Sequence, residues 1–208
     1  MKLARRILGV VCIILGVLAL ITPLTPGSWL IFVGAEILGI ELVFAKRAVA
    51  YLNGFAGRLT VLGLILAPFL AGAIGAYFTM PNIATWYAFL TRPWWTPPAY
   101  VFGPVWTALY ALMAVAIYLA WRSGGAERRL IASVFVAQLV LNALWSIVFF
   151  GMHSPAMALA VIAMLWLSIA WLIMLVAPRA RTAAWLLVPY LLWVSYAATL
   201  NLGIVVLN

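Results

Sequence analysis

The chain has 208 residues, of which 69% are hydrophobic and only 7% are charged. Soluble domains carry about 25% charged residues, so this composition excludes a soluble domain of any size and predicts an integral membrane protein. The net charge of +9 does not indicate a nucleic-acid partner, because the basic residues form neither an amphipathic stripe nor a patch with interleaved aromatic residues.

Two short apolar segments open the chain, at about 7–22 and 28–45, and a turn rich in proline and glycine joins them. Basic residues precede the first segment, but no small-residue cleavage site follows, so we expect a retained span rather than a signal peptide. Both segments are short for about 30 Å of hydrocarbon, so two complete spans and a re-entrant hairpin are both open. Because the aliphatic composition ends near Arg58, we assign residues 1–59 to an N-terminal hydrophobic hairpin.

Longer apolar runs follow, each near the roughly 20 residues that cross a bilayer. We expect spans at about 60–80, 100–121, 130–150, 155–176 and 183–206. The predicted fold is an all-α integral membrane protein, in which the two-helix hairpin precedes a five-helix domain at residues 60–208. Small residues repeat four apart in the first of these spans, which favours close helix approach within the bundle or across a dimer: Gly63, Ala67, Ala71 and Gly75.

The basic residues predict an orientation. With the hairpin counted as two spans, every basic residue except Arg92 falls on one side of the membrane, and a re-entrant hairpin gives the same parity. The positive-inside rule then places the N-terminus in the cytoplasm and the C-terminus and the 81–99 loop on the outer side. We expect a multi-pass protein of a bacterial-type inner (cytoplasmic) membrane.

The stretch from Trp86 to Tyr110 combines many aromatic residues with helix-breaking ones, Pro93, Pro97, Pro98, Gly103 and Pro104. An interfacial aromatic belt explains Trp86, Tyr87 and Trp94. A belt does not explain the Pro-Pro pair or the continuation of aromatic residues into the next span. Those features favour a structured lid that closes over a cavity.

Two later spans carry polar residues among aromatic ones. Gln138, Asn142, Trp145 and Phe149 share one helical face by their spacing. Carboxamides are costly in hydrocarbon unless they face protein or a cavity, so interhelical hydrogen bonds and a ligand pocket are both open here. In the last span, Trp193, Ala197 and Asn201 are four apart, with Tyr196 and Leu200 beside them. This pattern suits either a slot for a flat apolar body or a close helix crossing at Ala197.

The sequence offers no constellation for hydrolysis or metal binding. His153 is the only histidine, and no Asp occurs in the chain. Glu127 falls in a predicted cytoplasmic loop, and no nucleophile–base arrangement or phosphate-binding loop is found. Glu36 is the only candidate for an ionisable residue inside the membrane. We therefore expect neither a metal site nor hydrolytic or proton-relay catalysis.

At these residues the chain closely resembles the TspO/MBR family, the tryptophan-rich sensory proteins related to the mitochondrial translocator protein. The resemblance covers about residues 60–208, and several motifs carry it in order. They are Arg92-Pro93-x-Trp95-x-Pro97-Pro98, Val101-Phe102-Gly103-Pro104-Val105-Trp106-x-x-Leu109-Tyr110, Gln138-Leu139-x-Leu141-Asn142-x-x-Trp145-x-x-x-Phe149-Phe150-Gly151 and Pro189-Tyr190-Leu191-x-Trp193-x-x-Tyr196-Ala197-x-x-Leu200-Asn201.

The resemblance implies a five-helix bundle, commonly a homodimer in the lipid bilayer, with a ligand pocket under the first long loop. It implies no required cofactor. The implied ligand is a tetrapyrrole of the porphyrin or haem type, or a sterol-like small molecule. The ligand-binding positions that carry over are Trp95, Phe102, Trp106, Tyr110, Asn142, Trp145, Phe149, Trp193, Tyr196, Ala197, Leu200 and Asn201.

The resemblance favours a receptor, sensor or transporter over an enzyme. Light-dependent porphyrin breakdown, which in some members involves the tryptophans matching Trp106 and Trp193, is an alternative, and a structural membrane scaffold is another. The chain departs from the family pattern for cholesterol, because no basic residue follows Tyr196. The N-terminal extension is not part of the usual family core and resembles small Pro-Gly-containing bacterial membrane modules of unknown role.

Overall fold

The computed structural model describes residues 43–123 and 125–208, and the chain divides into two compact units that meet between Gly57 and Arg58. Five helices of the described residues are long and apolar enough to cross a membrane, and no strand occurs among them. The predicted all-α membrane fold is therefore confirmed for this part of the chain. The first predicted apolar segment and nearly all of the second lie outside the described residues.

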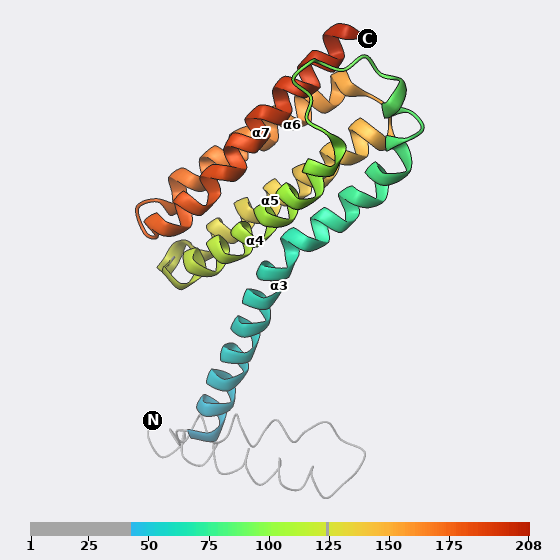
Figure 1. The fold of residues 1–208 in the computed structure, drawn as a ribbon. Coiled ribbons are helices and arrows are strands. Elements are labelled where there is room, and N and C mark those ends of the chain that lie inside the picture. Colours follow the sequence, from blue (N-terminus) through green and yellow to red (C-terminus); the bar gives the residue numbers. More distant parts are fainter. Residues whose placement is uncertain (1–42, 124) are drawn as a thin grey trace, which may run out of the picture. The chain divides into compact units, whose positions relative to one another are not determined.

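The helices follow one another through short connections, apart from one long loop (Figure 1). Their bounds are α3 Val43–Ile83, α4 Ala99–Ser123, α5 Arg128–Ser146, α6 Pro155–Val176 and α7 Arg181–Leu207. A π-helical turn, η4 Ile147–Gly151, continues α5 without a break, and short 3₁₀ turns occur at η2 Tyr87–Phe89 and η3 Gly125–Glu127.

The start of α3 corrects one prediction. The predicted span at about 60–80 agrees with the apolar stretch Gly57–Ile83, but the loop expected before it is absent from the described residues, because α3 is already helical at Val43 and runs unbroken past Arg58. The basic residues near Lys46 suggested a loop, yet a charge removes no backbone hydrogen bond. Glycine costs a helix only about 1 kcal/mol, and the first proline inside α3 is Pro68. Nothing between Val43 and Pro68 therefore forces the helix to stop.

Helices α4 to α7 form a closed ring in which α5 packs on α6, α6 on α7, and α4 on both α5 and α7. The centre of the ring is apolar and fully buried, with side chains such as Met113, Ile131, Phe135 and Ile169. Burial of such side chains also fixes which face of each helix looks inward. The exposed faces are equally apolar, as expected where lipid is the solvent.

Helix α3 meets the ring through its small residues. At Gly72 a side chain would overlap the ring of Tyr110, and at Gly75 it would meet the hydroxyl of Ser146 at 3.0 Å. By contrast, nothing lies within 4 Å of the place where a side chain on Gly63 would begin. Of the predicted ridge, Gly75 thus provides close approach inside the bundle and Gly63 does not, whereas Gly72, which lies closest to another helix, was not among the predicted positions.

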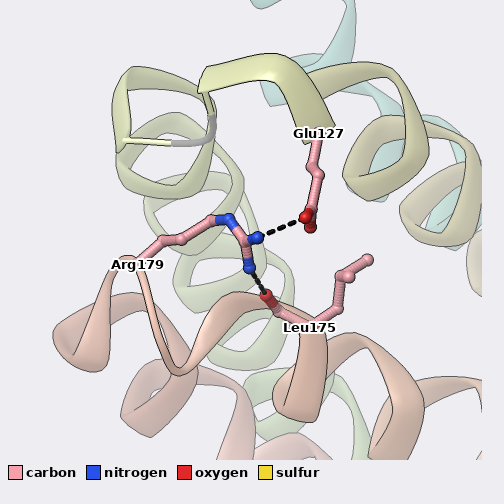
Figure 2. Close-up of polar contacts among 3 residues, drawn as sticks. All are labelled: Glu127, Leu175 and Arg179. Atoms are coloured by element: carbon pink, nitrogen blue, oxygen red, sulfur yellow. Dashed lines mark hydrogen bonds and ion pairs between the residues drawn. The ribbon is translucent and has the colours of Figure 1, made fainter.

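An ion pair links two connections at the end of the bundle away from the long loop. The guanidinium of Arg179 binds the carboxylate of Glu127 and donates to the carbonyl of Leu175 at 3.1 Å (Figure 2). Both charged side chains are partly exposed, at 31% and 39% of their surface. Exposed pairs of this kind contribute about 0–1 kcal/mol, so this contact positions the two connections more than it stabilises the fold.

Candidate ligand site

The lid segment, residues 84–98, connects α3 to α4 and is docked on α7. The hydroxyl of Tyr196 donates to the carbonyl of Trp95 at 2.7 Å. In the middle of the segment, the amide of Thr91 donates to the side-chain oxygen of Asn208 at 2.9 Å, and the Asn208 side-chain amide donates to the Thr91 carbonyl at 3.0 Å. These bonds satisfy backbone groups that a proline-rich loop cannot pair by itself.

Between these bonds the lid segment makes one close apolar contact with α7. Pro93 is buried, and its ring lies where a side chain on Gly203 would begin. Gly203 therefore has to be glycine for the lid segment to reach α7. This contact positions the proline-rich motif over the end of the bundle.

A chain of hydrogen bonds crosses the interior from α4 to α5 and α7. The hydroxyl of Tyr110 donates to Asn142 Oδ1 at 3.3 Å, and Asn142 Nδ2 donates to the hydroxyl of Tyr190 at 3.2 Å. Tyr190 in turn donates to Gln138 Oε1 at 2.9 Å. Interhelical hydrogen bonding, one of the two interpretations left open for these carboxamides, is what the structure shows for both. Among the described residues, the Gln138 side-chain nitrogen is buried without a hydrogen-bond partner.

A third buried carboxamide joins three elements near the lid segment. Asn201 is only 1% exposed; its Oδ1 accepts a bond from the Trp145 indole at 3.0 Å, and its Nδ2 donates to the Pro155 carbonyl at 2.8 Å. The Trp145 ring stacks on Phe149 at a centroid distance of 5.1 Å. Because Phe149 lies in the π-helical turn η4, this irregular turn determines where the stack sits.

Further aromatic rings line the space between α4 and α7. Trp106 stacks on Tyr110 at 5.4 Å and meets Tyr190 edge-on at 6.2 Å. Phe102 meets Trp193 edge-on at 5.8 Å, and the Trp193 indole nitrogen is buried without a hydrogen-bond partner in the described part of the chain. The rings pack against one another, so a flat ligand that enters would replace these ring–ring contacts with its own.

The predicted ligand positions thus come from the lid segment, α4, α5 with η4, and α7. Trp106, Tyr110, Trp145, Trp193 and Ala197 all pack against one buried core cluster, whereas Leu200 is itself buried. No ring contact joins Trp106 to Trp193 among the residues that the structure describes.

Tyr190 was missing from the predicted positions, although it occupies the centre of the polar chain. Its signal was present, because it follows Pro189 in one of the motifs and places a hydroxyl in the middle of an apolar span. A hydroxyl buried in hydrocarbon is costly without a hydrogen-bond partner, so the depth of Tyr190 in its span already indicates a role in a polar network.

The aromatic-belt interpretation applies to only part of the lid segment. Trp94 is 91% exposed, as expected of a residue at the membrane surface. Trp86, however, stacks on His153 at 4.5 Å and meets Phe149 edge-on at 5.6 Å. His153 itself has a left-handed φ of 51° and a 2.8 Å contact from its Nε2 to Asn82 Oδ1. Trp86 is therefore a packing residue that ties the lid segment to the connection between η4 and α6.

Within residues 43–123 and 125–208, no group of three or more His, Cys, Asp or Glu residues lies close enough to hold a metal ion. What the site offers is flat apolar walls and a few buried polar groups. Such a combination suits the binding of a flat, largely apolar molecule.

Comparison with known proteins places this arrangement among related sequences. The sequence model of the TspO/MBR family matches residues 64–207, and that of the putative transmembrane protein (PGPGW) family matches residues 2–54. The Tryptophan-rich protein TspO of Archaeoglobus fulgidus is 39% identical over 150 residues, which is 72% of this chain and 97% of that protein. The Tryptophan-rich sensory protein of Cereibacter sphaeroides is 41% identical over 123 residues, 59% of this chain and 77% of that protein. The human Translocator protein is 35% identical over 152 residues, covering 67% of this chain and 85% of that protein.

Proposed function

The chain belongs to the TspO/MBR family, and we propose that it is a membrane receptor or transporter that binds tetrapyrroles and related flat apolar ligands under the lid segment. The names of its relatives, a sensory protein and a translocator protein, describe those proteins and agree with such a role. No cofactor is needed for binding of this kind, because stacking and burial supply the affinity.

The observation that carries the proposal is the convergence of three tryptophans from three helices. Trp106 of α4, Trp145 of α5 and Trp193 of α7 pack against the same buried core. A tetrapyrrole is a flat aromatic body, and it needs flat apolar walls on both faces. Soluble cores seldom use three indoles for simple packing, since an indole nitrogen must then find a partner. Here the nitrogen of Trp193 has none among the described residues.

Asn142 supplies the polar end of the proposed site. Within the described part of the chain, its Oδ1 accepts one bond, from the Tyr110 hydroxyl at 3.3 Å, which is long for a hydroxyl donor. A carbonyl oxygen has two lone pairs, so Asn142 retains capacity for a second donor, such as a pyrrole N–H. We propose that this residue orients the ligand while the aromatic rings provide most of the affinity.

Titration of the purified protein with protoporphyrin IX tests the proposal. We expect saturable quenching of tryptophan fluorescence, because indoles in contact with the porphyrin lose their emission. The Trp193→Phe, Ala197→Leu double variant removes one wall and fills the slot beside it, and should weaken binding about tenfold or more. The loss of roughly 1.4 kcal/mol that this requires is within what one well-packed aromatic contact contributes.

Trp185→Phe is the matched control, because Trp185 lies on the same helix but is 71% exposed. It should change the starting emission and leave the midpoint of the titration unchanged. Quenching that never saturates, or a midpoint that the double variant leaves in place, contradicts a specific site.

We also propose that the lid segment faces the outer side of a bacterial-type inner membrane. Five basic residues lie at the end of the bundle away from the lid segment: Arg122, Arg128, Arg129, Arg179 and Arg181. The lid segment itself contains one basic residue, Arg92. The positive-inside rule assigns the basic end to the cytoplasm.

Cysteine labelling tests this orientation. In a Cys12→Ser background, Ala88→Cys adds an exposed thiol in the lid segment, and Ala126→Cys adds one in η3. A membrane-impermeant maleimide applied to intact spheroplasts should label the first variant and reach the second only after permeabilisation. The reverse pattern would overturn the orientation and leave the proposed ligand site unaffected.

A further inference from the structure

The outer surface of the lid segment carries two adjoining hollows, and Trp95 is the one predicted ligand position that lines either of them. One, of about 450 Å³, lies over the lid segment itself, beside Thr96 and Pro97, and its exposed lining is mostly polar. The other, of about 560 Å³, is an apolar groove between Trp94 of the lid segment and Leu202 and Val206 of α7. Arg92 lines both of them.

The apolar groove opens away from the bundle. Trp94 is 91% exposed and Val206 is 74% exposed, so both walls present apolar surface to the surroundings of the protein. In a membrane protein those surroundings are the boundary between acyl chains and headgroups at this end of α7. The groove therefore faces lipid rather than the interior of the bundle.

The walls of the groove are held in place without a ligand. Pro93 is seated on Gly203, and Thr91 and Asn208 exchange two hydrogen bonds. A ligand that enters the groove does not have to order the lid segment first, so it avoids the entropic cost of doing so.

Arg92 places an uncompensated charge where the two hollows meet. Its guanidinium lies 5.6 Å from the centre of the Tyr87 ring, and no carboxylate forms an ion pair with it among the described residues. Burial raises the pKa of the Tyr87 phenol above its usual value, with Arg92 partly opposing the shift, so Tyr87 is neutral near pH 7. The positive charge of Arg92 is thus free to bind an anion.

We infer that an anionic phospholipid binds here, with its phosphate on Arg92, its headgroup in the polar hollow and one acyl chain in the apolar groove. A free phosphate would leave the groove empty, and an apolar molecule would leave Arg92 unpaired; a phospholipid satisfies both at once. This site lies on the outside of the lid segment, and Trp95 is the one predicted ligand position that it shares with the proposed tetrapyrrole site.

Photo-crosslinking in nanodiscs of phosphatidylcholine tests the inference. The probes are phosphatidylglycerol and phosphatidylcholine that carry the same diazirine-labelled acyl chain, and the crosslinked peptides are mapped by mass spectrometry. We expect residues 202–207 to be labelled about fivefold more by the anionic probe, which is the preference that one arginine near the membrane surface provides. Glycerol phosphate at millimolar concentration should not compete, because it has no acyl chain.

Three variants identify the residues responsible. Arg92→Gln should bring the two probes to equal labelling of residues 202–207, whereas Arg181→Gln, which removes a cation from the opposite end of the same helix, should retain the preference. Val206→Trp fills the groove and should reduce labelling by both probes. Equal labelling of the unchanged protein by both probes, or a preference that survives Arg92→Gln, overturns the inference. No porphyrin is present, so the outcome is independent of the proposed function.

Discussion

Replacement of Gly203 by valine is expected to detach the lid segment from α7. The first atom of the new side chain would overlap Cγ of Pro93, whose ring is buried against α7. Overpacking of this kind costs about 1–3 kcal/mol, which is enough to undo a loop held by a few hydrogen bonds. The bonds from Thr91 to Asn208 and from Tyr196 to Trp95 should break along with the apolar contact.

Hydrogen exchange reports this detachment directly. In the unchanged protein the amide of Thr91 is bonded to Asn208 and the amide of Thr96 to the Pro93 carbonyl, so both should exchange slowly. In Gly203→Val we expect both to exchange about tenfold faster or more, while amides within α5 keep their rates. Gly63→Val is the control, because nothing lies within 4 Å of the position that its side chain would take. Equal exchange in the two variants would show that Pro93 does not hold the lid segment.

Detachment of the lid segment should also change how fast a ligand leaves the proposed ligand site. If the lid segment closes that site, a porphyrin bound to Gly203→Val should dissociate faster than from the unchanged protein, since closing loops mainly slow release. The groove for a phospholipid would be lost as well, because one of its walls is the lid segment. A single glycine thus links the two proposed sites.

The docking of the lid segment illustrates what the sequence could not predict. Hydropathy predicts the spans because length and apolar composition alone decide whether a helix crosses lipid. The contact between Thr91 and Asn208 joins residues 117 positions apart, and nothing in the local sequence of either indicates it. Gly203 likewise occurs in an ordinary apolar run, and its importance appears only once Pro93 lies against it.

The π-helical geometry of η4 could not be predicted from the sequence either. The π-helical turn η4 has the same apolar character as the α-helix before it, so its hydrophobic pattern gives no warning of the change. That turn nevertheless places Phe149 against Trp145 and Trp86. The shared face of Gln138 and Asn142 was predictable from spacing, because a straight helix repeats every 3.6 residues. Their hydrogen-bond partner Tyr190 comes from α7, and only the closing of α4 to α7 into a ring brings its hydroxyl to α5.

Replacement of Asn201 or Gln138 by leucine should lower the free energy of unfolding by different amounts, because the two side chains differ in how completely they are hydrogen-bonded. Asn201→Leu removes an acceptor from the Trp145 indole and a donor to the Pro155 carbonyl, and both of these partners are partly buried. Interhelical bonds in membranes contribute about 0.6–2 kcal/mol each, so we expect a loss of about 1–3 kcal/mol in the free energy of unfolding in mixed micelles. The emission of Trp145 should shift as its indole loses its partner.

Gln138→Leu is the matched comparison, with the same replacement at a site that is equally buried. It removes the acceptor for Tyr190, but it also removes a side-chain nitrogen that has no partner in the described part of the chain. An unpaired buried amide already costs about 1–3 kcal/mol, so its removal offsets the lost bond and the net change should be below about 1 kcal/mol. If Gln138→Leu destabilises the bundle as much as Asn201→Leu, then Gln138 Nε2 has a partner, such as a buried water, and the polar chain extends beyond Gln138.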